Sequence, residues 1–232
     1  KKINLKINTY NYYGRRLSYR GSKEKLNFAK KIFPAVKLKK SDIKKLISYV
    51  SVSKVPCILE VGFGMGDNLR YMLANEKKSL FIGCEPYLSG IVNFLSDLDK
   101  KDYSRVKIYD NDIRILLELL PNNFFSKIIL LFPDPWPKKR HQKRRLFNDT
   151  NIVYFLRTLV KNGEIYFGTD IEDYFLKVKN FFVKNKNKYQ IQNDGAFNKL
   201  PSVITETKYA RKSLKKGVLP KYLVVKKKVD IL

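Results

Sequence analysis

Short apolar runs of strand length alternate with segments of helical periodicity, and this alternation constrains the fold more than any other feature of the chain. The predicted strands are 55–61, 80–85, 106–109, 127–132 and 164–168, and the predicted helices are 67–75, 88–98, 113–120, 146–160 and 171–183, with a further helical period starting at Ser41. Because these strands are apolar on both faces, they predict an α/β fold, a doubly wound and mostly parallel sheet with helices on each side. A last strand near 222–225 is expected to pair antiparallel at the end of the sheet.

The charge balance indicates the kind of partner. The chain has 48 Lys and Arg against 21 Asp and Glu, a net charge of +27. Codon bias toward lysine is the alternative explanation, but such bias alone does not produce so large a deficit of acids. A polyanion, and nucleic acid in particular, is the expected partner. No apolar run approaches the roughly 18 residues that a bilayer span needs, so no membrane partner is expected.

The N-terminal residues and the two cysteines indicate the cellular compartment and the domain organisation. Residues 1–10 contain no apolar core of a secretory signal, and Cys57 and Cys84 lie in apolar strand-like runs as expected of reduced core thiols, so a cytoplasmic protein is predicted. Residues 1–40 are basic and aromatic without a long apolar period and are interpreted as an arm, which either contacts nucleic acid or packs its tyrosines on the body. Residues 41–232 are predicted to form one domain. Monomer and homodimer both fit the sequence.

A glycine-rich turn follows the first predicted strand. Glu60 precedes Gly62, Gly64 and Gly66, and the turn opens a helix at the carboxyl edge of the sheet, where doubly wound folds bind ligands. An acid at this place disfavours a pyrophosphate and favours a cationic ligand. S-adenosylmethionine, which carries a sulfonium and an ammonium group, fits this requirement.

The next two strands also end in acids. Glu85 is placed to accept hydrogen bonds from both hydroxyls of a ribose, a role common to dinucleotide and S-adenosylmethionine sites. Asp112 follows the third strand, where it suits an adenine edge and also the N-cap of the helix that begins at Ile113. Both roles can hold together.

A proline-rich motif after the fourth strand gives the most specific signal. Three prolines flank Asp134 and Trp136 and restrict the backbone, which indicates a preorganised site at the edge of the sheet. The run that follows is predicted to be a phosphate clamp, and His141 within it is expected to have a lowered pKa and to contact phosphate or a base rather than act as a general base. The run comprises Lys138, Lys139, Arg140, His141, Gln142, Lys143, Arg144 and Arg145.

Together, the segments 60–66 and 132–141 resemble the signature segments of the bacterial tRNA (guanine-N7)-methyltransferases, over roughly 14–225. The resemblance implies a class I S-adenosylmethionine-dependent methyltransferase fold, Rossmann-like, and methyl transfer to N7 of guanine 46 in the tRNA variable loop. It implies tRNA as the partner, S-adenosylmethionine as the cofactor, S-adenosylhomocysteine as its product, and no metal. The alternatives are a methyltransferase for another RNA base or for ribosomal RNA, and a non-catalytic basic RNA-binding protein.

The resemblance also implies roles for individual residues. Asp134 would be the catalytic residue. The cofactor would be bound by Glu60, Gly62, Gly64, Gly66, Glu85, Asp112 and Asp134. The substrate would be bound by Lys138, Asp170, Thr207, Lys208 and Tyr209, and RNA by Arg140, His141, Gln142, Lys143, Arg144 and Arg145.

The chain departs from the family pattern at one place. Thr207-Lys208-Tyr209 is followed by Ala210, where the family usually has a glutamate that would accept hydrogen bonds from guanine. If this tail segment is extended, Glu206 lies too far along it to replace that carboxylate, and an Ala210→Glu substitution is expected to increase activity.

Overall fold

A computed structural model describes residues 19, 21–193 and 200–230 of the chain. The strands are β1 (Cys57–Val61), β2 (Leu80–Cys84), β3 (Val106–Tyr109), β4 (Phe125–Leu131), β5 (Leu159–Thr169), β6 (Tyr189–Ile191) and β7 (Lys221–Lys227). The α-helices are α1 (Lys23–Val36), α2 (Ile43–Ser53), α3 (Asp67–Asn75), α4 (Leu88–Ser96), α5 (Ile113–Leu119), α6 (Ile152–Thr158), α7 (Glu172–Lys184) and α8 (Lys208–Leu214). Short 3-10 helices are η1 (Lys40–Asp42), η2 (Lys100–Asp102) and η3 (Lys139–Arg144).

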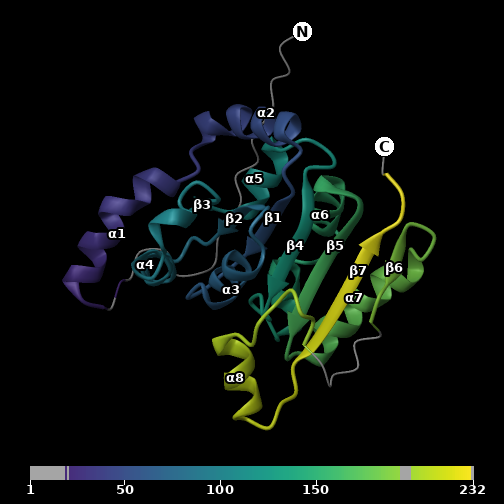
Figure 1. Ribbon diagram of the computed structural model, residues 1–232. Helices are drawn as coiled ribbons and strands as arrows, with labels where there is room; N and C mark the ends of the chain where they lie inside the picture. The colour runs from purple at the N-terminus through teal and green to yellow at the C-terminus, as the bar shows by residue number, and fades with distance from the viewer. Residues whose placement is uncertain (1–18, 20, 194–199, 231–232) are drawn as a thin grey trace.

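One sheet of seven strands organises the molecule, in the order β3-β2-β1-β4-β5-β7-β6 (Figure 1). The five strands from β3 to β5 are parallel, and β7 pairs antiparallel with both β5 and β6. The doubly wound, mostly parallel α/β sheet with an antiparallel C-terminal strand is therefore confirmed. All parallel strands end at one edge, so the loops that follow β1, β2, β3 and β4 meet there.

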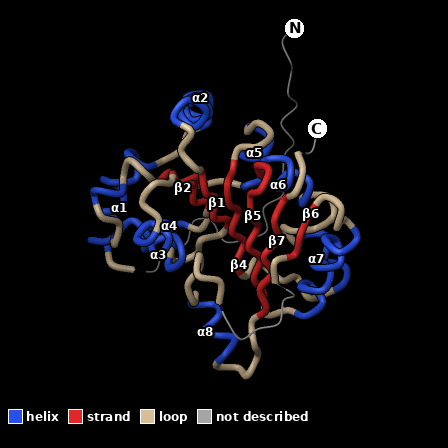
Figure 2. The backbone as a smooth tube through the Cα atoms, turned by 45° about the vertical axis from the view of Figure 1, so that its right-hand side comes forward, coloured by secondary structure: helices blue, strands red, loops and turns tan. Residues whose placement is uncertain are grey.

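Side chains alternate along each strand and divide the core into two layers, one on each face of the sheet. Leu59, for example, packs in a cluster with residues of α5, α6 and α7, whereas its neighbour Ile58 packs with residues of α1, α3 and α4. Figure 2 shows the sheet between α1, α3 and α4 on one side and α7 on the other. Cys57 and Cys84 lie in this core as free thiols, as predicted.

Part of the segment that we interpreted as an arm is a packed helix. Ser22 caps α1 by accepting a hydrogen bond from the Lys25 backbone N–H, and Ala29, Ile32 and Val36 are buried on one face of the helix. The three buried positions follow a helical period that the surrounding lysines obscure. Residues 1–18 and 20 lie outside the described residues, so the arm and its boundary at residue 40 stay a prediction.

Two other elements differ from their predicted bounds. The helix expected over 146–160 begins only at Ile152, because the Asn148 side chain accepts hydrogen bonds from the backbone N–H groups of Thr150 and Asn151 and forms a turn first. The strand expected over 164–168 extends in both directions to form β5. In the described part of the chain, no helix combines the length and the apolar character needed to cross a bilayer.

Candidate functional site

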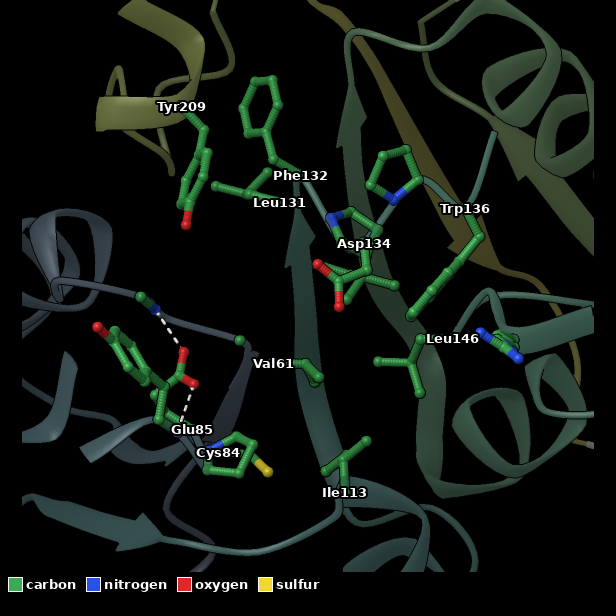
Figure 3. A pocket seen from close by; sticks show the side chains of 18 of the residues that line it. Val61, Cys84, Glu85, Ile113, Leu131, Phe132, Asp134, Trp136, Leu146 and Tyr209 are labelled. Atoms are coloured by element: carbon green, nitrogen blue, oxygen red, sulfur yellow. Dashed lines mark hydrogen bonds between the residues drawn. The ribbon is translucent and has the colours of Figure 1, made fainter. Parts of the chain in front are cut away.

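A cavity of about 1010 Å³ opens at the carboxyl edge of the sheet, and half of the predicted site residues border it (Figure 3). Of the residues expected to bind a cofactor, its wall contains Gly62, Gly64, Glu85, Asp112 and Asp134. Of those expected to bind substrate or RNA, it contains Asp170, Tyr209, Lys143 and Arg144. In Figure 3, Glu85 lies on one side of the cavity, Asp134 on the other, and Tyr209 projects from α8 above them.

The glycine turn forms one end of the cavity. Gly62, Gly64 and Gly66 all have positive φ angles, of 68°, 55° and 84°, a region that residues with a Cβ rarely adopt. α4 also approaches closely, because a Cβ on Gly90 would lie 2.2 Å from the carbonyl oxygen of Gly64. Gly66 packs against Phe94 instead of facing the cavity, so this glycine shapes the turn without lining the site.

Glu85 is fixed by the turn that it faces. Its Oε2 accepts a hydrogen bond from the Gly64 N–H at 2.8 Å, and its Oε1 accepts one from the Tyr87 N–H at 2.9 Å (dashed in Figure 3). Burial raises the pKa of Glu85 to about 7, although these two hydrogen bonds oppose the shift. A carboxylate has about four lone-pair sites, so Glu85 can still accept from a ligand with two hydroxyl groups.

Glu60 does not line the cavity, contrary to expectation. It lies beneath the turn at 2% exposure, where Oε1 accepts a hydrogen bond from Asn68 Nδ2 at 3.1 Å. Burial raises its pKa to about 8, and Oε2 has no partner among the described residues. Burial thus disfavours the charged form of Glu60 on which the sequence argument relied, and its role in binding the cofactor stays a prediction.

Asp112 caps α5 and holds an arginine. Its Oδ1 accepts hydrogen bonds from the backbone N–H and from Nε of Arg114, and its Oδ2 accepts one from Arg114 Nη2 at 2.6 Å. The predicted N-cap is therefore confirmed. Asp112 also reaches the cavity wall, but most of its acceptor capacity is used by Arg114.

The proline-rich motif bends sharply after β4. Phe132 and Trp136 have positive φ angles of 52° and 40°, a strained conformation of the kind that concentrates at functional sites. Asp134 points into the cavity between them (Figure 3). Its side chain makes no hydrogen bond to another described residue, and partial desolvation raises its pKa above the ordinary value. A carboxylate held in this way is free to act on a ligand.

Arg145 does not contact solvent, so its predicted role in RNA binding is wrong. It is 1% exposed, its Nε donates to the Pro135 carbonyl oxygen at 2.8 Å, and its Nη2 donates to Asp173 at 2.7 Å. The guanidinium also lies 4.6 Å from the ring centroid of Tyr174. Arg145 thus joins the proline-rich motif to α7, and the basic run divides into outer cations and one inner anchor.

The rest of the basic run forms η3 beside the cavity. Lys143 and Arg144 reach the cavity wall, and the guanidinium of Arg144 lies 5.0 Å from the ring centroid of Trp136. His141 meets the same tryptophan edge to face, and partial burial with the neighbouring cations lowers its pKa, as predicted. Gln142 faces α7, where its amide donates to Asp173. Arg140 and Lys138 are exposed outside the cavity wall.

The tail segment that we treated as extended is helix α8. Thr207 is its N-cap and accepts a hydrogen bond from the Ala210 N–H at 3.2 Å, so Thr207 is occupied within the helix. Lys208 is exposed outside the cavity wall. Ala210 is 1% exposed, and a glutamate there would have to fit a packed helix face. The argument for Ala210→Glu assumed an extended segment, and this assumption is wrong; the effect of the substitution on activity stays a prediction.

Sequence reasoning missed several residues of the cavity wall. They are Tyr87, Arg114, Lys212, Ser213 and Lys216. The last three come from α8 and the residues after it, and no apolar period signals this helix. The available signal was Thr207, a residue type that is preferred at helix N-caps.

Comparison with known proteins gives consistent results. A family described as "Putative methyltransferase" matches residues 54–221. The chain is 33% identical over 231 residues to a tRNA (guanine-N(7)-)-methyltransferase of Bartonella henselae, covering 94% of this chain and 95% of that one. It is 34% identical over 176 residues to a protein of the same name from Wolbachia pipientis wMel, covering 76% and 75%.

Two further similarities are partial. The chain is 33% identical over 167 residues to a "Bifunctional methyltransferase" of Rickettsia felis, covering 72% of this chain but only 32% of that protein. Among solved structures, an rRNA methylase from Streptococcus thermophilus aligns with a TM-score of 0.52 at 9% identity, covering 78% of this chain and 95% of that one. At this identity the structural likeness concerns the fold alone.

Proposed function

The chain belongs to the tRNA (guanine-N7)-methyltransferase family, and on this premise we propose that it transfers a methyl group from S-adenosylmethionine to N7 of guanine 46 in the variable loop of tRNA. The observation that carries the proposal is the cavity itself. It joins a glycine turn with a fixed carboxylate, at Glu85, to an unpaired carboxylate at Asp134. The end with Glu85 suits a methyl donor that contains a nucleoside, and the end with Asp134 suits a base that must be oriented for methylation.

The donor end fits S-adenosylmethionine on the chemistry of its residues. A Cβ built on Gly62 would meet nothing within 4 Å, so open space adjoins the backbone there. Glu85 offers remaining acceptor sites for the two ribose hydroxyls, and Asp112 and Asn111 border the place expected for the adenine. When bound, S-adenosylmethionine supplies an electrophilic methyl group on a sulfonium and leaves as S-adenosylhomocysteine.

Little acid–base chemistry is required of the protein. Guanine N7 has an in-plane lone pair at neutral pH, so no proton is removed before attack and no general base is needed. The protein must orient the purine and stabilise the positive charge that develops on it. Asp134 can do both, because it points into the cavity without another described partner. Trp136 and Tyr209 line the same cavity (Figure 3).

The outer cations are proposed to bind the RNA backbone. Lys143 and Arg144 border the cavity. Arg140, Lys138 and Lys208 are exposed and lie in or next to η3 and α8, which both contribute residues to its wall. A guanine in a loop can be displaced from its stack at low cost, which lets the base enter a cavity of this size. Location in the cytoplasm stays a prediction.

The site of methylation is tested with two tRNA transcripts that differ at one nucleotide. One carries guanine 46 and the other adenine 46. Each is incubated with the protein and methyl-labelled S-adenosylmethionine. We expect label in the guanine transcript and none in the adenine transcript. Equal labelling of both would contradict the proposed position. Label in neither transcript, with label in ribosomal RNA in a parallel reaction, would favour another substrate.

A further inference from the structure

Ser213 on α8 makes a side-chain contact that the proposed mechanism does not use. Its hydroxyl donates to Asp170 Oδ2 at 2.6 Å, a length typical of a charge-assisted hydrogen bond. The same oxygen lies 3.1 Å from the Tyr209 carbonyl, but a hydroxyl has a single hydrogen, and the shorter contact to the carboxylate is the stronger one. Ser213 is 4% exposed, and both Ser213 and Asp170 border the cavity.

Four carboxylates border the cavity, and Asp170 is the one that hydrogen-bonds to α8. Asp134 is already proposed to orient the purine and stabilise its charge, so we look for the group that reads the opposite edge of the base among the other three. Glu85 is held by two backbone N–H groups beside the glycine turn, and Asp112 is occupied by Arg114. Ala210 has no acceptor. Asp170, which directly follows β5, receives one side-chain hydrogen bond and keeps the rest of its acceptor sites. Guanine presents two adjacent donors, N1–H and N2–H, which suit a carboxylate.

α8 is held in a defined place by the first two turns of α3. Asn68, which is buried, accepts a hydrogen bond from the Thr205 N–H at 2.9 Å, and the Tyr71 hydroxyl donates to the Ser202 carbonyl at 3.0 Å. Arg211 of α8 forms an ion pair with Asp67 at 3.2 Å. These contacts fix the helix that carries Ser213, so the hydroxyl meets Asp170 in one geometry.

We propose that Ser213 is a positioning residue for guanine selection: its hydroxyl holds the Asp170 carboxylate in the rotamer that accepts from N1–H and N2–H of the target base. The proposal rests on the proposed function. With the hydroxyl removed, Asp170 loses its one side-chain hydrogen-bond partner among the described residues and rotates among several conformers. Binding of the base is then weaker and less selective, while the donor end of the cavity is unchanged.

The test compares guanosine with inosine at the target position of a tRNA transcript. Inosine has the same N7 but lacks the N2 amino group, so the ratio of the two kcat/KM values reports recognition of that edge and not methyl transfer itself. We expect the wild-type protein to prefer guanosine by about tenfold or more, the range for a hydrogen bond to a charged group. Ser213→Ala should lower this ratio at least threefold.

Two controls separate positioning from general damage. Ser96 is a helical serine of α4 whose hydroxyl donates to the Val92 carbonyl at 2.7 Å and does not border the cavity, so Ser96→Ala should keep the wild-type ratio. In an Asp170→Asn background, adding Ser213→Ala should change the ratio no further, because the serine acts through Asp170. If Ser213→Ala fails to fold, as judged by S-adenosylhomocysteine affinity, the near-isosteric Ser213→Cys replaces it.

The outcomes are distinct. An unchanged guanosine-to-inosine ratio in the Ser213 variant, or an equal decrease with and without Asp170, overturns the inference. A wild-type protein that methylates both transcripts equally also overturns it. If the wild-type protein methylates neither transcript, the proposed function fails first.

Discussion

At the scale of single residues, substitution of Asp134 tests the proposed chemistry most directly. Replacing Asp134 by Asn or Ala should lower kcat by roughly 10²- to 10³-fold, the usual cost of removing one group that stabilises transition-state charge. The folded state should hardly change, because Asp134 makes no hydrogen bond to another described side chain. Single-turnover kinetics measure the first effect. Thermal unfolding should differ by less than about 0.5 kcal/mol, and a larger change would mean that Asp134 has a structural role.

Glu85 makes the second residue-scale prediction, which concerns pH. Burial raises its pKa from 4.5 to about 7 in the unliganded fold, so the folded protein binds more protons than the unfolded chain between these values. The stability contributed by this difference is present below about 4.5 and is lost as pH rises through about 7. Glu85→Gln should therefore flatten the decline of the unfolding free energy over this interval, as measured by urea denaturation.

Ligand affinity should have the opposite pH dependence. The ionised Glu85 is the better acceptor for ribose hydroxyls, so S-adenosylhomocysteine should bind more tightly as pH rises through about 7 and level off above it. Calorimetry between pH 6 and 8.5 measures this. The Glu85→Gln variant serves as the control, since it has no proton to lose. A wild-type affinity that is independent of pH would place the ribose elsewhere.

At the scale of elements, the basic run around η3 contains two kinds of arginine. Arg145 is buried and binds Pro135 and Asp173, whereas Arg140 is exposed. Arg145→Met should lower the unfolding free energy by about 1–3 kcal/mol, because it removes hydrogen bonds from a buried position. Arg140→Met should change it by less than about 0.5 kcal/mol. Equal effects in urea denaturation would contradict the distinction between anchor and outer cation.

Elements differ in how well the sequence predicts them, for physical reasons. The central parallel strands could be predicted because burial on both faces makes them continuously apolar. α1 and α8 could not be predicted, because each helix buries only a few residues between exposed lysines. In α8 the buried residues are Ala210 and Ser213. Arg145 was misassigned for a related reason. Neighbouring Arg144 and Arg145 look alike in the sequence, and only the packing of α7 against the loop separates them.

The same limit applies to the candidate site. Glu85 and Asp134 could be predicted because Glu85 directly follows β2 and Asp134 lies in the short loop after β4, so both reach the ligand edge of the sheet. Ser213 could not, because its partner Asp170 is distant in the sequence and only the tertiary placement of α8 brings the two together.

At the scale of the whole molecule, the net charge of +27 makes RNA binding sensitive to salt. Replacing Arg140, Lys143 and Arg144 together by Ala should weaken tRNA binding and reduce the slope of log affinity against log salt by roughly 0.7–0.9 for each lost phosphate contact. The matched control replaces Lys40, Lys44 and Lys45, three exposed cations before β1 that do not border the cavity. An equal change of slope in both variants would mean that total positive charge, and not the position of the cations around η3, determines tRNA binding.

The most direct measurement of the central claim is chemical mapping of the methylated nucleotide. Total tRNA is incubated with the protein and labelled S-adenosylmethionine, and the product is reduced and treated with aniline, which cleaves the chain at N7-methylguanosine. The account predicts label at a single variable-loop guanine, with cleavage at that nucleotide and none when the Asp134→Ala variant is used. Label recovered on an exocyclic amine, or label without cleavage, would contradict it.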